Sequence, residues 1–108
     1  MGRYHSYINT ALKILQSFNG EMPFSIFIRQ FFAKEKKYGS KDRKQIAALC
    51  YSYFRVGLAL NKEINAENLL AAFFIVNNEA SILIQELKPE WHGHEADTLE
   101  EKIKLIQK

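Results

Sequence analysis

The sequence predicts an all-α protein, a compact bundle of five to six helices joined by short loops. Apolar residues recur at steps of three and four along most of the chain, which is the spacing of one helix face. Turn and capping residues interrupt these apolar stripes, and no stretch shows the alternating pattern of a strand. Because 108 residues suffice for one domain, we expect residues 1–108 to form a single helical domain.

The first two helices are predicted from their aromatic and aliphatic faces. Residues 4–18 place one apolar face on a helix that Asn19-Gly20 ends, and the face consists of Tyr4, Ile8, Ala11, Leu15 and Phe18. Pro23 suits the first turn of a second helix, and Tyr38-Gly39 is its expected end. The apolar face of this second helix consists of Phe24, Phe27, Ile28 and Phe31.

A third helix is predicted from Ser40, which is a good N-cap residue. Asp42 in its first turn complements the positive end of the helix dipole. The stripe expected to face the core comprises Ile46, Leu49, Cys50, Tyr53, Phe54 and Gly57. At 100° per residue the opposite face comprises Lys41, Lys44, Ala48, Tyr51, Ser52 and Arg55.

Three further helices are expected in the second half. One follows Asn65 and breaks at Asn77-Asn78, with an inward face of Leu69, Leu70, Phe73 and Phe74. A short one covers residues 79–87 and ends at Lys88-Pro89, because the residue before a proline is pushed out of the helical region. Residues 91–98 are irregular and predict a surface loop. Asp97 or Thr98 then caps a last helix, in which the Thr98–Glu101 spacing is that of a capping box and the apolar residues are Leu99, Ile103 and Ile106.

Charge is distributed unevenly along the chain. The net charge is +3, but residues 1–54 hold nine Lys/Arg against three Asp/Glu, and residues 55–108 hold six against nine. The first half is therefore +6 and the second half −3. The basic excess is concentrated in residues 34–44. A dense basic segment on a soluble domain can be a nucleic-acid contact, but composition alone slightly favours the alternative, a well-solvated helix junction.

The sequence contains little that points to catalysis. It has no glycine-rich phosphate loop and no strand–turn–helix unit for a nucleotide, so the chain by itself is not predicted to be an enzyme. His92 and His94 have metal-like spacing, but no further Cys or His cluster completes a site, and we expect no metal. Cys50 lies on the core stripe, which favours a buried, inert thiol.

The cysteine count and the length of the apolar runs indicate the compartment of the protein and its relation to membranes. A single cysteine permits no intramolecular disulfide, and no apolar run approaches the roughly 20 residues that span a bilayer. We therefore expect a cytoplasmic protein without a membrane partner.

The basic segment and the outer face of the third helix predict an RNA contact. Lysines and arginines supply affinity for phosphates, a helix N-terminus favours an anion, and an exposed tyrosine can stack on a base. The candidate RNA-binding residues are Lys36, Lys37, Lys41, Arg43, Lys44, Tyr51 and Arg55. A plain solvated face remains the alternative.

The stretch GSKDRKQIAALCYSYFRVG, residues 39–57, resembles a motif of a known family. It is similar to the NusB-like helical domain at the N-terminus of bacterial ribosomal-RNA cytosine-C5 methyltransferases, the Sun/Fmu (RsmB) group. In that group G-S-x-D-R precedes an apolar helix and Y-x-x-x-R, and the resemblance extends over roughly residues 4–60. Asp42, Arg43 and Arg55 match the motif by position, and Asp42 and Arg43 have either a structural role or an RNA contact.

The resemblance implies a division of labour. In that family a separate Rossmann-like domain binds S-adenosylmethionine and carries the nucleophilic cysteine, to which Cys50 does not correspond. The helical domain helps to bind and position ribosomal RNA. We therefore expect no cofactor in this chain, which would be the N-terminal portion of a longer methyltransferase whose own catalytic domain and ribosomal RNA, not DNA, are its partners.

Two alternatives stay open. The antitermination factor NusB shares the fold and the closing arginine of the motif, so the chain could be a stand-alone factor of that type. Its first helix has only Lys13 inside it, whereas an arginine-rich first helix is typical of NusB. The second alternative is a protein-docking or structural domain that uses the acidic second half as its interface.

Overall fold

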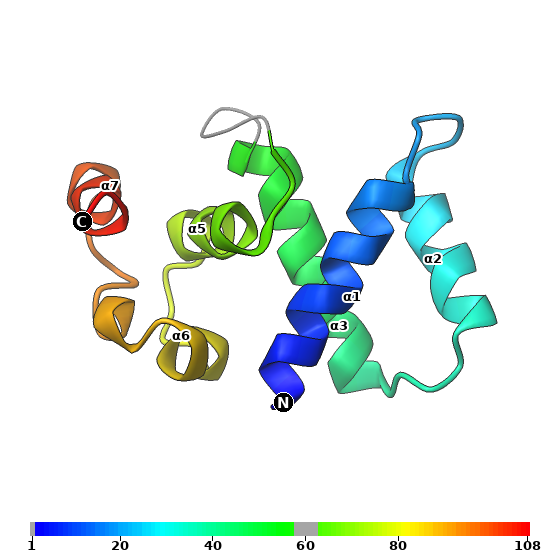
Figure 1. Cartoon of the computed structure of the whole chain (residues 1–108), viewed down its shortest axis with the longest axis horizontal. Helices are drawn as coiled ribbons and strands as arrows, with labels where there is room; N and C mark the ends of the chain where they lie inside the picture. Colours follow the sequence, from blue (N-terminus) through cyan, green and yellow to red (C-terminus); the bar gives the residue numbers. More distant parts are fainter. Residues whose placement is uncertain (1, 58–62) are drawn as a thin grey trace.

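The fold was established from a computed structural model that describes residues 2–57 and 63–108. Within these ranges the chain is helical and contains no strand, so the predicted all-α bundle is confirmed (Figure 1). The elements are α1 (Arg3–Ser17), α2 (Phe24–Lys34), α3 (Ser40–Ser52), the π-helical turn η1 (Tyr53–Gly57), α5 (Ala66–Val76), α6 (Ile82–Leu87), the 3₁₀ turn η2 (Pro89–Trp91) and α7 (Leu99–Ile106).

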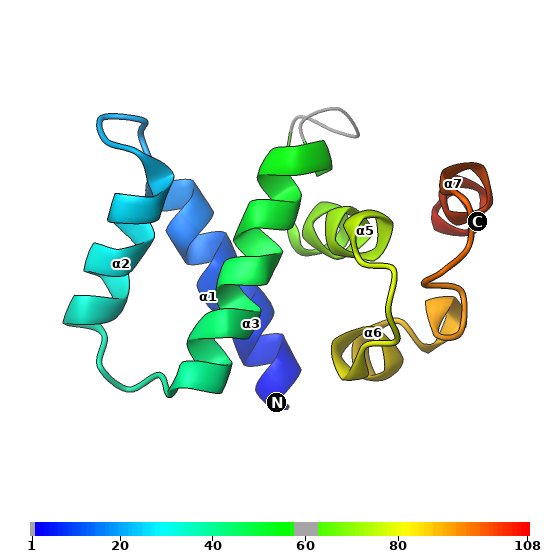
Figure 2. The same cartoon turned by 180° about the vertical axis from the view of Figure 1, so that it is seen from behind.

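Helices α1, α3 and α5 form the centre of the bundle. In Figures 1 and 2, α2 lies on one side of the α1–α3 pair and α5, α6 and α7 lie on the other. The residues that these three helices bury include several with no exposed surface, namely Ala11, Ile14, Ile46, Leu49, Cys50, Leu69, Ala72 and Phe74. Removal of apolar surface from water is the main driving force of folding, so the burial of this core stabilises the fold.

The first helix matches its prediction closely. Its buried face includes Ile8, Ala11 and Leu15, as the spacing predicts, while Tyr4 and Phe18 are only half-buried. The chain leaves the helix at Phe18, and Gly20 follows with a φ of +82°, a conformation that glycine adopts without strain. The Asn19-Gly20 break is therefore confirmed.

The second helix is shorter than predicted. It ends at Lys34 rather than at Tyr38-Gly39, and Pro23 is its N-cap rather than a first-turn residue. The reason is tertiary: the Tyr38 hydroxyl forms a hydrogen bond of 2.9 Å with the Thr10 hydroxyl on α1, and its ring packs against Phe32. The chain must leave the helix to place Tyr38 there.

The third helix also begins one residue earlier than expected, because Gly39 rather than Ser40 is its N-cap. The Gly39 carbonyl accepts the amide of Arg43 at 3.0 Å, and the Asp42 carboxylate accepts the Gly39 amide at 3.1 Å. A glycine N-cap has no side chain to offer, so the Asp42 carboxylate supplies the local hydrogen bond.

The predicted core stripe of this helix is correct up to Tyr53 and wrong at Phe54. Phe54 is 37% exposed, although its ring lies 4.7 Å from that of Phe24. A π-helical turn begins at Tyr53 and contains more residues per turn than an α-helix. From Phe54 onward, positions therefore no longer follow the 100° spacing.

The two helices that follow begin at side-chain caps. The Asn65 side chain caps α5 by accepting a hydrogen bond from the amide of Asn68 at 2.9 Å, and the helix ends at Val76, directly before the predicted break at Asn77-Asn78. Helix α6 begins at Ile82 rather than at Glu79, because Ser81 is its N-cap. It ends at Leu87, with Lys88 as the C-cap directly before the proline, which confirms the predicted end.

The prediction that residues 91–98 form a surface loop is wrong at Trp91 and Glu95. Trp91 is buried and its ring stacks on Phe74 at 4.9 Å. Glu95 is also buried, and its carboxylate accepts the amides of Gly93 at 2.8 Å and Ser81 at 3.4 Å. Burial raises the pKa of Glu95, but these amide hydrogen bonds more than offset it and the pKa lies below its ordinary value.

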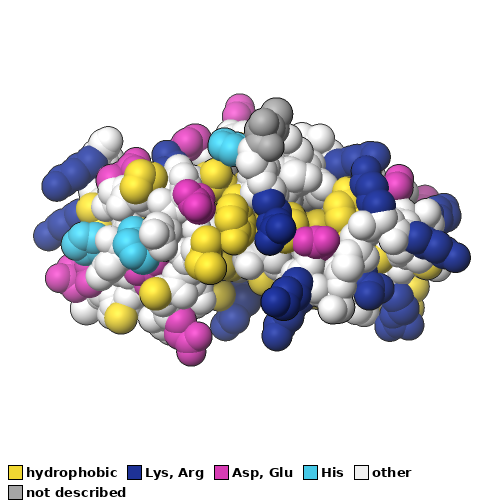
Figure 3. Space-filling model, turned by 90° about the horizontal axis from the view of Figure 1, so that it is seen from below, with side chains coloured by type: hydrophobic (Ala, Val, Ile, Leu, Met, Phe, Trp, Pro, Cys, Tyr) yellow, Lys and Arg dark blue, Asp and Glu magenta, His cyan; other side chains and the backbone are white. Residues whose placement is uncertain are grey.

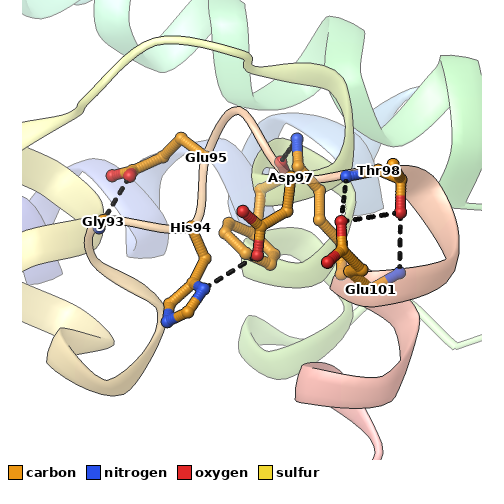
Figure 4. Close-up of polar contacts among 8 residues, drawn as sticks. Gly93, His94, Glu95, Asp97, Thr98 and Glu101 are labelled. Carbon is orange, nitrogen blue, oxygen red and sulfur yellow. Dashed lines mark hydrogen bonds and ion pairs between the residues drawn. The ribbon is translucent and has the colours of Figure 1, made fainter.

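The last helix begins at the predicted capping box. Thr98 and Glu101 exchange hydrogen bonds between side chain and amide, as Figure 4 shows. Its predicted apolar face is wrong at Leu99, which is 58% exposed, whereas Lys102 is buried. The Lys102 ammonium donates to the carbonyls of Phe74, Ile75 and Asn77, at distances of 3.0 to 3.3 Å.

Lys102 thus caps the C-terminal end of α5 from another helix. Those carbonyls are the acceptors that a helix end leaves unpaired, and a cation is favoured there. Burial lowers the pKa of Lys102, and the nearby carboxylates of Asp97 and Glu95 act in the opposite direction.

Candidate nucleic-acid interface

The basic segment lies where α2 ends and α3 begins. Lys36 and Lys37 occupy the connection between the helices, and Lys41, Arg43 and Lys44 lie in the first turns of α3. All five side chains are exposed. Figure 3 shows lysine and arginine side chains in the middle of this view and on its right-hand side, towards α2, and further ones at the opposite end of the molecule. The candidate residues before Gln45 therefore lie at one end of the α1–α3 helix pair (Figure 1).

The seven candidates do not share a single helix face. Lys41 and Arg43 are two residues apart on α3, so their side chains point about 200° apart around its axis. Lys41 and Lys44 line a groove towards α5 and α6, which Arg43 does not border. Ser52, which the helical spacing placed on the outer face, is instead buried, and its hydroxyl donates to the Ala48 carbonyl at 2.7 Å.

Tyr51 and Arg55 lie apart from the lysines. Fourteen residues separate Arg55 from Lys41, which corresponds to about 20 Å along the helix axis. Tyr51 is 41% exposed, but its ring makes an edge-to-face contact with Phe24 on α2 at 5.4 Å. The tyrosine that was expected between two cations is thus part of an aromatic cluster beside α2.

Arg3 is a basic residue of this end that the sequence reasoning missed. It stands at the start of α1 and lines a hollow of about 330 Å³ together with Lys37, Tyr38 and Asp42. Its place depends on how α1 packs against α3. No local pattern in the sequence indicates that, since 34 residues of chain separate Arg3 from Lys37.

Asp42 has a structural role in this arrangement. The Tyr7 hydroxyl on α1 donates a hydrogen bond to one oxygen of its carboxylate, and the Gly39 amide donates to the other. These two hydrogen bonds hold the pKa of Asp42 below its ordinary value, and the same contact raises the pKa of Tyr7. A carboxylate already occupies the start of α3, so this helix end attracts phosphate less than the sequence suggests.

The remaining chemistry-bearing side chains lie elsewhere. Cys50 is fully buried, and desolvation raises its pKa to about 12, as expected for an inert thiol. The His92 Nδ1 atom lies 3.4 Å from a carboxylate oxygen of Glu95. The His94 Nδ1 atom lies 2.8 Å from a carboxylate oxygen of Asp97, as Figure 4 shows. In the described part of the chain, no group of three or more His, Cys, Asp or Glu side chains could hold a metal ion.

No family model, no curated protein and no solved structure matches this chain. Within residues 2–57 and 63–108, no helix is both long enough and apolar enough to cross a membrane.

Proposed function

We propose that this chain is an RNA-binding domain that contacts RNA with the basic end formed by α1 and α3. The observation that carries the proposal is density of charge: five of the nine residues from 36 to 44 are exposed Lys or Arg. Arg3 adds a further cation from a different helix. Exposed cations at this density attract a phosphate backbone, and the attraction does not depend on sequence.

The resemblance of residues 39–57 makes the proposal more specific. The chain would be the accessory domain of a ribosomal-RNA cytosine-C5 methyltransferase and would position RNA for a catalytic domain beyond this sequence. S-adenosylmethionine would bind to that other domain. Of the motif residues, Asp42 acts on the fold through Tyr7 and Gly39, so Arg43 and Arg55 are the ones left to contact RNA or the catalytic domain.

A second candidate function, protein docking, is favoured by one observation. Three large apolar side chains on or beside α2 are exposed to between 37% and 41%, namely Ile26, Tyr51 and Phe54. Tyr51 and Phe54 both pack against Phe24, so two of the three form a continuous surface. Exposed apolar surface of this kind marks interaction sites, and a catalytic domain of the same protein would be a suitable partner.

A salt titration tests RNA binding directly. A ribosomal-RNA hairpin is titrated with the protein at 50 mM and 200 mM salt, and affinity is expected to fall steeply between them because phosphate contacts release counterions. Binding that does not change with salt would contradict a phosphate-based contact. Absence of binding at the lower salt would reject the proposed function and leave docking as the better candidate.

A further inference from the structure

A groove separates α3 from the α5–α6 connection. It has a volume of about 570 Å³, within the range of pockets that hold small organic ligands. Lys41, Lys44 and Ala48 form the wall on α3, and Ala80, Ser81 and Ile82 belong to the opposite wall. Tyr4 of α1 and Phe73 of α5 also line it.

The apolar part of the groove is unusually open to solvent. Ile82 is 61% exposed, more than any other large apolar side chain of the described residues. Tyr4 is half-buried, and its ring is held edge-on against Tyr7 at 5.6 Å. The groove thus presents an aliphatic side chain and an aromatic ring. Both can cover a flat apolar surface.

The charges of the groove are placed on opposite walls. Lys41 and Lys44 are three residues apart, so both project from the same side of α3. Glu79 lies on the other wall and repels anions from there. Figure 3 shows hydrophobic side chains directly beside Lys and Arg near the middle of this face. A suitable ligand therefore has an anionic group on the α3 side and a flat apolar group on the α6 side.

We propose that this groove takes one unpaired nucleotide of an RNA strand, with its phosphates on Lys41 and Lys44 and its base against Ile82 and Tyr4. The inference rests on the proposed RNA binding and adds the class of RNA. Bases in a duplex are stacked and cannot enter such a groove, whereas bases in loops and bulges can be turned outward. The domain then prefers looped RNA to a fully paired stem of equal length.

The test compares two RNAs and two matched variants. The RNAs are a hairpin with an unpaired loop and a fully paired duplex of the same number of nucleotides. Ile82→Ser removes the exposed aliphatic group of the groove. Leu99→Ser is its control, because Leu99 is also the first residue of a short helix and is 58% exposed, but lies on α7.

The parent protein and L99S are expected to bind the hairpin several-fold more tightly than the duplex. I82S should bind the two RNAs almost equally, with unchanged affinity for the duplex. Ala48→Gln, which fills the groove from the α3 wall, should have the same effect and provides a second variant if I82S melts below L99S. Thermal melts establish that each variant is folded.

The outcomes separate the two proposals. If the parent binds neither RNA, the proposed function fails and the inference fails with it. If the parent binds both RNAs equally, or if both I82S and A48Q keep the preference for the hairpin, RNA binding stands and the nucleotide groove is rejected.

Discussion

The two halves of this protein differ in whether they bury charged side chains. In α1–α3 the lysines and arginines lie on the surface, and the interior contains apolar and aromatic side chains together with the uncharged Thr10 and Ser52. In α5–α7 two charged residues, Glu95 and Lys102, are buried and hold separate segments together. The first half can therefore offer its charge to a partner, whereas the second half uses part of its charge to fold.

The difference shows that net charge by region is an incomplete guide to function. The second half is acidic by composition, but the carboxylate of Glu95 is engaged with the amides of Gly93 and Ser81. Asp42 shows the same in the basic half, since it binds Tyr7 and Gly39 rather than a partner. Buried or paired charges must be subtracted before a surface is assigned to a partner.

Removal of Lys102 is expected to have the largest effect. Lys102→Met leaves three carbonyls at the end of α5 without their donor, and hydrogen bonds to a charged group are the strong ones, so we expect a loss of about 3 kcal/mol in the free energy of unfolding. Lys104→Met on the same helix is exposed and should change it by less than about 0.5 kcal/mol. Urea unfolding of both variants provides the measurement. Equal effects would mean that the buried ammonium contributes nothing beyond its aliphatic stem.

Charge reversal at the basic end should change binding rather than folding. Lys41→Glu with Lys44→Glu is expected to weaken RNA binding at least about tenfold and to reduce the salt slope by about 1.4, because two phosphate contacts are lost. Lys104→Glu with Lys108→Glu makes the same change in net charge on the C-terminal helix and beyond it. If this second pair weakens binding as much, net charge alone governs affinity and the basic end is not the RNA surface.

The smallest expected effect concerns acid stability. The pKa of Asp42 is below its ordinary value of 3.8, so its contribution to stability is present above that pH and is lost as the pH falls through the lowered pKa. Asp42→Asn should therefore reduce the fall in melting temperature between about pH 5 and pH 3. Glu101→Gln should reduce the fall in melting temperature in the same way, because the hydrogen bonds between Glu101 and Thr98 lower the pKa of Glu101. Glu100→Gln, in the same turn of α7, serves as the control. A D42N curve parallel to the parent's would show that Asp42 does not couple folding to acid.

The sequence by itself determined the helical class, most helix ends and most of the core. Helical periodicity and local caps act within a few residues, so the Asn19-Gly20 break, the Asn65 cap, the Thr98–Glu101 capping box and the inward face of α5 could all be predicted. The exposure of the basic segment followed in the same way from its composition. These features depend on neighbours along the chain.

The tertiary structure decided where distant groups meet. Tyr38 leaves α2 to reach Thr10, Lys102 turns inward to the end of α5, and Arg3 joins the basic end from another helix. The π-helical turn after Ser52 moves Phe54 outward, which the 100° spacing does not anticipate. Each result depends on a partner brought close by packing or on a local change of helical pitch. Packing and pitch therefore divided the single face expected on α3 into a lysine-lined groove and a separate aromatic surface.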